Sequence, residues 1–348
     1  MGIASPLVTV LMPVYNAELH VKDSINSILE QSFGDFELIV FNDGSTDRSR
    51  EVILRISDNR IIFIDSSVNI GYVAHLNNGL AIARGKYVAR MDADDIALVN
   101  RFEKQVALLE QQPEIGLCGT AFSTFDAQEV TVILPVKDVQ IREFMLRDSP
   151  MGHPTVMFRN QLVKQYGLRY NQKFMPAEDY KLWYDFSKIT QLENLPEGLL
   201  NYRVHLHQIS SYQSQKQRNN ADAVRVLQLI DKGFHLTQNE QELYCQMLRY
   251  EVRPQTAAEL KVILNLMQKI SEENDRLNAY DGLWFRRLFE NVWRDAVNRI
   301  ELYNPTHIAD IIFPKELVTG SFGFLDKAKF LIKGLIGWKA RTSFPPKN

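Results

Sequence analysis

Three aspartates that follow a short β-prone run are the residues best suited to chemistry. In the segment 86–95 (KYVARMDADD), Asp92, Asp94 and Asp95 come where a strand ends, and a strand interior would not bury them without a partner. Residues i and i+2 of an extended chain point to the same side, so Asp92 and Asp94 can face a cation together. Carboxylate oxygens are ligands that Mg²⁺ and Mn²⁺ prefer. The alternative is a helix cap, because aspartate is favoured before a helix and residues 96–110 have helical spacing.

A second acidic pair lies in the segment 176–183 (PAEDYKLW). One carboxylate of Glu178 and Asp179 could take the proton from an acceptor hydroxyl while the other orients it. Trp183 could then offer a flat face to a sugar ring. The alternative is structural, because acidic residues are favoured at a helix start and Trp183 belongs to the apolar face that would dock this helix.

Two histidine segments could contribute to the same site. His153 lies in a turn that enters a strand, and it could face the ligand crevice or serve only the turn. His205 and His207 would share one side of the extended segment 202–207 (YRVHLH). His205 could therefore add a nitrogen ligand to a metal or contact a phosphate, or it could be structural.

The elements that would position these residues alternate between strand and helix. Such an order predicts an α/β fold with a parallel, doubly wound sheet, whose ligands bind at the carboxyl edge of the strands. The loops after the first, second and fourth strands should therefore meet in one crevice. Apolar runs predict strands at 7–12, 36–41, 61–64 and 86–90, with helical spacing between them.

The first two of these loops carry groups suited to a nucleotide diphosphate. Residues 13–16 (PVYN) supply backbone groups and the ring of Tyr15, which would lie beside a ring or ribose. Asp43 could hydrogen-bond a base, although Asp43-Gly44 could also form an ordinary turn. Neither GxGxxG nor GxxxxGK[ST] occurs, which argues against a dinucleotide dehydrogenase and a P-loop enzyme.

Whole-chain properties limit the function further. The 348 residues suffice for one large domain or two, and a formal net charge of -2 gives no sign of nucleic-acid binding. Cys118 and Cys245 lack metal-type spacing and fit a reducing compartment. No stretch approaches the roughly 18 apolar residues that span a bilayer, and the start lacks the layout of a signal peptide. These features predict a cytoplasmic protein.

Beyond residue 213 the motifs stop and helical spacing continues. The tail 322–341 predicts a basic amphipathic helix, in which lysines lie beside an apolar face. Such a helix could lie on an anionic membrane, at the inner face of the plasma membrane, or pack on its own domain. The oligomeric state is not indicated. Helices are predicted at 221–234, 240–251, 257–270 and 283–302.

The motifs along residues 7–212 resemble those of family 2 glycosyltransferases of the GT-A fold, such as enzymes of bacterial cell-surface polysaccharide and lipopolysaccharide assembly. The resemblance implies a Rossmann-like, mostly parallel sheet flanked by helices, with a nucleotide-binding half at 1–100, an acceptor-side half at 101–212 and a helical region at 213–348. It also implies inverting transfer from a nucleotide sugar, usually a UDP-sugar, to a glycan or lipid-linked oligosaccharide, with Mn²⁺ or Mg²⁺. The segments that carry it are PVYN, NDGSTD, residues 69–79, ARGKYVARMDADD, GHPTVMFR, AEDYKLW and YRVHLHQIS.

Carried over by position, the resemblance assigns a role to each motif. Asp179 would be the catalytic base, with Glu178 beside it. Asp92 and Asp94 would hold the metal and diphosphate, and Asp92 would also contact the ribose. The residues expected to contact substrates are Pro13, Tyr15, Asn16, Asp43, Asn69, Gly71, Asn77 and Asp92 for the donor, and His153 and Trp183 for the acceptor.

One position departs from the family pattern. Many members have an Arg-Asn pair where this chain has Leu76 and Asn77, so a basic group near the diphosphate is missing or is supplied by Arg84, Arg90 or Arg203. Two alternatives to an active transferase remain. One is a protein of this fold that binds nucleotide sugars without activity, and the other is a sugar nucleotidyltransferase, which normally needs a glycine-rich basic loop after its first strand.

Overall fold

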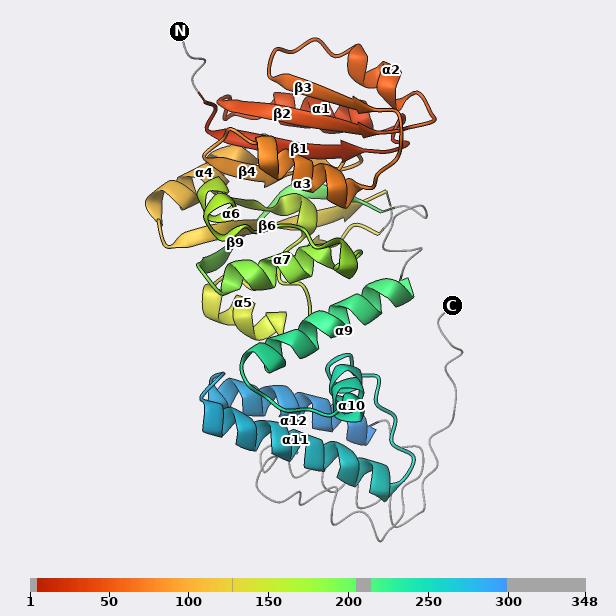
Figure 1. Cartoon of the computed structure of the whole chain (residues 1–348), viewed down its shortest axis with the longest axis vertical. Coiled ribbons are helices and arrows are strands. Elements are labelled where there is room, and N and C mark those ends of the chain that lie inside the picture. Colours follow the sequence, from red (N-terminus) through yellow and green to blue (C-terminus); the bar gives the residue numbers. More distant parts are fainter. Residues whose placement is uncertain (1–4, 127, 205–213, 299–348) are drawn as a thin grey trace. The chain divides into compact units, whose positions relative to one another are not determined.

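The computed structural model describes residues 5–126, 128–204 and 214–298, and the chain divides into two compact units, Met1–Val224 and Arg225–Asn348 (Figure 1). The first unit contains a nine-stranded sheet with the order β3-β2-β1-β4-β8-β6-β9-β5, and β7 pairs with β6. The strands are β1 (Val8–Val14), β2 (Phe36–Asp43), β3 (Ile61–Ser66), β4 (Tyr87–Arg90), β5 (Ile96–Ala97), β6 (Ile115–Phe125), β7 (Thr131–Val132), β8 (Met157–Arg159) and β9 (Gln191–Arg203).

The first four strands are parallel, as the alternating pattern predicts. β1 pairs with β2 on one side and β4 on the other, and β2 pairs with β3. Their carboxyl ends therefore lie at one edge of the sheet, where β2 ends at Asp43 and β4 ends at Arg90. Beyond β4 the sheet is mixed, because β8 is antiparallel to β4 and β6 while β6 and β9 are parallel. The α/β, Rossmann-like fold is confirmed.

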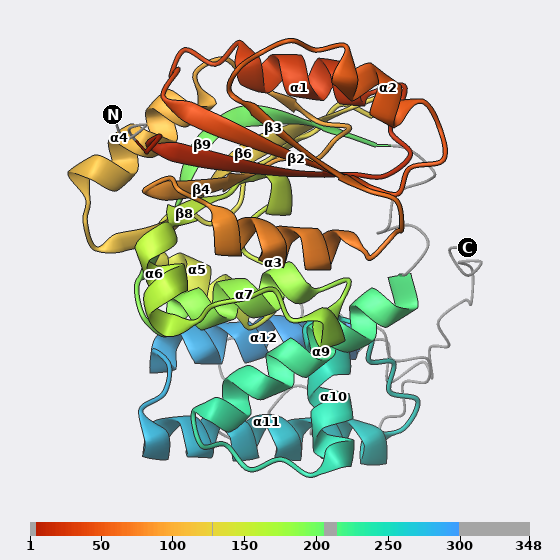
Figure 2. The same ribbon diagram turned by 45° about the horizontal axis from the view of Figure 1, so that its top comes forward.

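Helices cover both faces of this sheet. Figure 2 shows α1 and α2 on one face and α3 on the other. The helices of the first unit are α1 (Val21–Leu29), α2 (Ser49–Leu54), α3 (Tyr72–Ile82), α4 (Arg101–Gln111), α5 (Asp138–Met145), α6 (Asn160–Tyr166) and α7 (Glu178–Ser187), with short 3₁₀ turns η1 (His153–Thr155) and η2 (Gln172–Phe174).

Side-chain alternation along β1 explains the two apolar layers. Val10 points to the face where Ile25 of α1 and Phe102 of α4 pack, and all three are fully buried. Leu11 points to the opposite face and meets Gly79 of α3. A Cβ atom at Gly79 would lie 2.6 Å from Leu11 Cδ2, so the glycine allows α3 to approach the sheet closely. This contact holds α3 against the sheet.

The structure corrects the helix predicted over 96–110. Ala97 belongs to β5, where it pairs with Leu200 of β9, and its N–H donates to Ser27 Oγ at 3.1 Å. These bonds hold the backbone in the sheet, so α4 begins only at Arg101, with Asn100 as its N-cap residue. The sequence pattern predicted only the end of β9. The pairing of β9 with β6 shifts in register more than once, so the side chains of β9 do not alternate regularly between the two faces of the sheet.

The described part of the second unit, up to residue 298, is helical, as predicted. α9 (Ser214–Asp231) crosses the boundary between the units, and α10 (Gln238–Leu248), α11 (Ala257–Leu277) and α12 (Gly282–Asn298) follow. Their core includes Tyr244, Met267, Phe289 and Trp293, all nearly without exposed surface. No helix in the described ranges is long and apolar enough to cross a membrane. The tail 322–341 lies outside the described residues, as does the end of the helix predicted over 283–302.

Candidate active site

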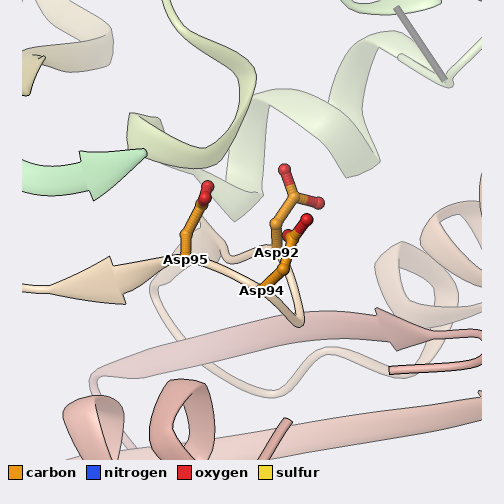
Figure 3. A group of neighbouring side chains, drawn as sticks. All are labelled: Asp92, Asp94 and Asp95. Atoms are coloured by element: carbon orange, nitrogen blue, oxygen red, sulfur yellow. The ribbon is translucent and has the colours of Figure 1, made fainter. Parts of the chain in front are cut away.

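The three aspartates after β4, here called the acidic triad (Asp92, Asp94 and Asp95), come together through a turn. Residues 93–94 form this turn between the end of β4 and the start of β5, so the extended backbone expected here is wrong. The turn nevertheless directs all three carboxylates to one side (Figure 3), and their ligand oxygens lie within 4.8 Å of one another. Asp92 and Asp94 therefore face a common space, and Asp95 joins them.

The acidic triad fits a hard divalent cation by chemistry and by spacing. With metal-oxygen bonds of about 2.1 Å, octahedral ligand oxygens lie about 3 Å apart when adjacent and about 4 Å apart when opposite. The triad spacing of up to 4.8 Å needs only small side-chain adjustments to meet this geometry. Asp92 and Asp94 are partly exposed, whereas Asp95 has no exposed surface. Asp92 and Asp94 are therefore the two residues that would hold the cation.

Asp95 has a structural contact in place of the cap considered above. Its Oδ1 accepts a 2.9 Å hydrogen bond from the backbone N–H of Arg203, at the end of β9. Asn100, not Asp95, precedes α4, so the cap interpretation is wrong. Burial, together with the charges of Asp92 and Asp94, raises the pKa of Asp95 well above its usual value. Asp95 thus ties the acidic loop to β9.

Two arginines supply positive charge beside the triad. Arg90, the last residue of β4, donates from Nη1 to Asp92 Oδ2. Burial raises the pKa of Asp92, and the charge of Arg90 opposes that effect. Arg203 Nε donates to the carbonyl oxygen of Asp94 at 2.8 Å, and its Nη1 donates to Asp126.

The other basic candidate lies elsewhere. Arg84 precedes β4, at the amino end of the strand, and its guanidinium pairs with Glu37. The triad lies at the carboxyl end of β4, away from Arg84. The prediction that Arg84 replaces the arginine found at position 76 in many family members is therefore wrong. Leu76, which stands at the family arginine's position, is fully buried.

Glu178 and Asp179 occupy the first turn of α7, after the N-cap residue Ala177. Burial raises the pKa of Asp179 to about 6. Burial and the charge of Asp179 raise the pKa of Glu178 to about 7. Glu178 is 3% exposed, whereas Asp179 keeps some exposed surface. A raised pKa makes a carboxylate a better proton acceptor, and Asp179 is the member of the pair that a ligand could reach.

Side chains from two other elements lie beside Glu178. The hydroxyl of Tyr72, at the start of α3, lies beside its carboxylate, and burial together with the charge of Glu178 raises the pKa of that hydroxyl. His153 Nδ1 lies 3.9 Å from Glu178 Oε1, and His153 Nε2 lies 3.2 Å from the hydroxyl of Tyr170. Burial and the charge of Arg90 lower the pKa of His153 well below its usual value, so this ring is neutral. His153 lies beside the acidic pair, and its contact with an acceptor stays a prediction.

Arg90 connects the two acidic motifs electrostatically. Besides its bond to Asp92, its charge lowers the pKa of both Glu178 and Asp179 against the effect of burial. Two motifs that are far apart in the sequence therefore lie within the electrostatic influence of one arginine. The alternation of Arg90 and Asp92 at the strand end is the sequence signal that could have predicted their pairing.

The loops expected to hold a nucleotide are joined to one another by hydrogen bonds. Asn16 Oδ1, after β1, accepts from the N–H of Thr46 at 2.8 Å, and the N–H of Asn16 donates to Ser45 Oγ at 3.1 Å. Tyr15 beside it is 51% exposed, so its ring is open to a ligand. Pro13 lies within β1 and is partly buried.

Asp43 fastens the loop after β3 to the end of β2. Its Oδ1 accepts from the N–H of Ile70 at 2.7 Å and lies 2.8 Å from His75 Nε2, and its Oδ2 accepts from the N–H of Gly71 at 3.0 Å. Because each carboxylate oxygen can accept about two hydrogen bonds, Oδ2 retains capacity for one more donor. Gly71 thus contributes its backbone to this loop, and Asn69 is exposed there. Base recognition by Asp43 stays a prediction.

One expected ligand contact, that of Trp183, does not fit the structure, whereas that of Asn77 stays a prediction. Asn77 donates from Nδ2 to the carbonyl oxygen of Tyr170 at 2.9 Å and accepts from its N–H at 3.0 Å, so it fastens α3 to that segment. Trp183 is fully buried and packs against the rings of His153, Tyr170 and Phe186, so it offers no face to a sugar. Its structural interpretation is the correct one.

The sequence did not predict three residues near the candidate site, and one predicted residue lies outside the part of the chain that the structure describes. Tyr72 and His75 follow the conspicuous segment at Asn69, but their partners lie on other elements and no local pattern connects them. Tyr170 lies in a loop without any motif. His205, predicted as a third metal ligand, lies outside the described residues.

Comparison with known proteins identifies the family. The model of "Glycosyl transferase family 2" matches residues 9–159. An uncharacterized glycosyltransferase of Haemophilus influenzae is 36% identical over 233 residues, which is 63% of this chain and 72% of that protein. The chain therefore belongs to the family 2 glycosyltransferases. This result confirms the resemblance of the ordered motifs and the class of enzyme.

A named relative and a solved structure add detail. The chain is 28% identical over 207 residues to "UDP-Glc:alpha-D-GlcNAc-diphosphoundecaprenol beta-1,3-glucosyltransferase WfgD" of Escherichia coli, covering 59% of this chain and 80% of that one. Residues 1–349 of S. aureus TarS in complex with UDP-GlcNAc superpose with a TM-score of 0.57 at 13% identity, covering 96% of this chain and 93% of that one. At this identity the second likeness concerns the fold.

Proposed function

We propose that this glycosyltransferase moves a sugar from a UDP-sugar to a glycan or lipid-linked oligosaccharide, with inversion at the anomeric carbon. The observation that carries the proposal is the joint position of two acidic motifs around Arg90. The acidic triad would hold a cation and the donor diphosphate, and Asp179, whose pKa is raised, would act as the base. In the proposed arrangement residues 1–100 bind the donor and residues 101–212 form the acceptor side.

The proposed mechanism is a single displacement. Asp179 accepts the proton of the acceptor hydroxyl while the oxygen attacks the anomeric carbon and the bond to the nucleoside diphosphate breaks. Glu178 lies beside Asp179 in the first turn of α7, and burial with the charge of Asp179 raises its pKa to about 7, so it would orient the reacting pair as its more protonated member. Mn²⁺ or Mg²⁺ bound by Asp92 and Asp94 would offset charge on the leaving diphosphate. Because the displacement is direct, the chain needs no covalent nucleophile.

The donor and acceptor classes are supported by the motifs and by the relatives. WfgD is named for a UDP-glucose donor and a diphosphoundecaprenol-linked acceptor, and TarS has been solved with UDP-GlcNAc. For this chain we infer the same classes and no particular sugar. A lipid-linked acceptor would suit an enzyme at the inner face of the plasma membrane, with the basic tail 322–341 on the anionic surface. Co-sedimentation with anionic liposomes, lost on removal of the residues after Gly320, tests that location.

A screen for UDP release tests the activity itself. The full-length protein is incubated with Mn²⁺ and each of a series of UDP-sugars, and free UDP is measured over time. We expect slow hydrolysis of one donor in the absence of acceptor, and faster release when a suitable glycan is added. The Asp179→Asn protein is the control for contaminating hydrolases. Failure to release nucleotide from any UDP-sugar, with UDP still bound, would favour a protein that binds nucleotide sugars without activity.

A further inference from the structure

Arg90 has a buried hydrogen-bond donor that the rest of the described chain does not satisfy. The residue is 6% exposed, and its Nη1 donates to Asp92. Its Nε, by contrast, is buried and has no hydrogen-bond partner within the described ranges. An unsatisfied buried donor costs about 1–3 kcal/mol, and more when it is charged. Such a group at a strand end therefore indicates a ligand atom that completes it.

The surroundings of Arg90 identify the chemistry of that ligand. Nη1 of the guanidinium donates to Asp92 of the acidic triad, and the charge of Arg90 also lowers the pKa of Glu178 and Asp179. Under the proposed function, the diphosphate lies at the triad and the reacting sugar lies between the triad and Asp179. A guanidinium that is bonded to the triad and acts electrostatically on the acidic pair is positioned to meet the anionic part of the donor.

Other basic groups near the triad are committed to protein atoms. Arg203 binds the carbonyl oxygen of Asp94 and the side chain of Asp126. Arg101 has no exposed surface, and its Nη2 donates to the carbonyl oxygen of Arg90. Leu76 carries no charge.

We propose that Arg90 is a donor-binding residue whose guanidinium donates hydrogen bonds to the diphosphate, and that it supplies the positive charge that Leu76 does not. This inference rests on the proposed function, because it assumes a nucleoside diphosphate at the acidic triad. The planar fork of a guanidinium matches two phosphate oxygens, whereas an ammonium offers a single charged point. Nε, which lacks a partner, is one arm of that fork.

Binding of UDP and uridine to full-length variants tests the proposal without relying on turnover. UDP affinity is measured by calorimetry with and without Mn²⁺, and uridine affinity by ligand-observed NMR. We expect Arg90→Met to weaken UDP binding about 10-fold to 100-fold, which corresponds to the loss of hydrogen bonds to a charged group. Arg90→Lys keeps the charge without the fork and should fall between. Uridine affinity should not change in either variant.

An arginine away from the triad provides the control for this experiment. Arg84→Lys changes an arginine that pairs with Glu37 away from the triad, and it should bind UDP as the wild type does. Thermal unfolding shows whether each variant is folded. If Arg90→Met is not folded, the UDP affinity of Arg90→Lys tests the proposal. Unchanged UDP affinity in Arg90→Lys and Arg90→Met, or an equal loss of uridine affinity, overturns the role of Arg90 alone. A wild-type protein that binds neither UDP nor uridine overturns the proposed function as well.

Discussion

The imidazole of His75 lies 2.8 Å from the carboxylate of Asp43, and the two side chains are only 3% and 4% exposed. His75 belongs to α3 and Asp43 ends β2, so this contact joins a helix on one face of the sheet to the carboxyl edge. With its proton on Nε2, the ring donates the third hydrogen bond that Asp43 receives, beside those of Ile70 and Gly71. The contact fixes the carboxylate at the edge where a nucleotide base would bind.

Replacing His75 should therefore weaken both the fold and donor binding. His75→Phe keeps an aromatic ring beside Phe41, whose centroid lies 5.2 Å away, but removes the donor to Asp43. We expect a loss of about 1–3 kcal/mol in the free energy of unfolding, measured in urea, because a buried charged acceptor loses a partner. UDP affinity should also fall. His75→Gln keeps an N–H donor and should recover part of both losses; equal effects of the two substitutions would contradict the argument.

Asp179→Asn should remove catalysis while donor binding persists. A positioned general base contributes about 10²-fold to 10⁴-fold in rate, so turnover should fall by at least that much. UDP affinity should stay within about twofold, because the donor is held at the triad. Asp185→Asn changes another acid of α7, one that pairs with Lys181, and should leave turnover nearly unchanged. Wild-type turnover in Asp179→Asn would remove the residue from the mechanism.

The pH dependence of transfer should report the acidic pair. Since burial raises the pKa of Asp179 to about 6, protonation of the base should reduce kcat/KM as the pH falls through that region. An ordinary aspartate would lose activity only near pH 4, at its usual pKa of about 3.9. A pH profile of kcat/KM for the wild type, with Mn²⁺ held saturating, measures this limb. A flat profile down to pH 4.5 would contradict the raised pKa.

Much of the fold followed from the sequence because its signals are local. Apolar runs and their spacing predicted β1 to β4 with the intervening helices, and the aspartates after β4 marked the site. Contacts between distant segments could not be predicted in this way. Ala97 pairs with Leu200 in the sheet, so the first turn of the helix predicted over 96–110 does not form. Trp183 is buried, so the sugar contact predicted for it is wrong. The pairing of His75 with Asp43 likewise depends on how α3 packs.

Glu178→Gln should stabilise the protein at alkaline pH. Burial and Asp179 raise the pKa of Glu178 to about 7, so between about pH 4.5 and pH 7 the folded protein binds more protons than the unfolded chain. Stability therefore falls as the pH rises through this window, and the uncharged glutamine does not suffer the loss. We expect Glu178→Gln to exceed the wild type by roughly 1–3 kcal/mol at pH 8 and to differ little at pH 4. Urea unfolding at both pH values measures it, and a larger gain at pH 4 would reverse the sign.

Asp94 and Asp95 should differ in their effect on metal-dependent binding, although they are neighbours in the acidic triad. Asp94 is partly exposed, so Asp94→Ala should abolish most of the gain in UDP affinity that Mn²⁺ produces. Asp95 has no exposed surface and accepts from the N–H of Arg203, and Asp95→Asn keeps that acceptor. It should retain most of the gain and unfold at no lower urea concentration, because burial disfavours the aspartate charge. Calorimetry with UDP, with and without Mn²⁺, compares the two. If Asp94→Ala kept the metal-dependent gain, the cation would not be held by Asp94.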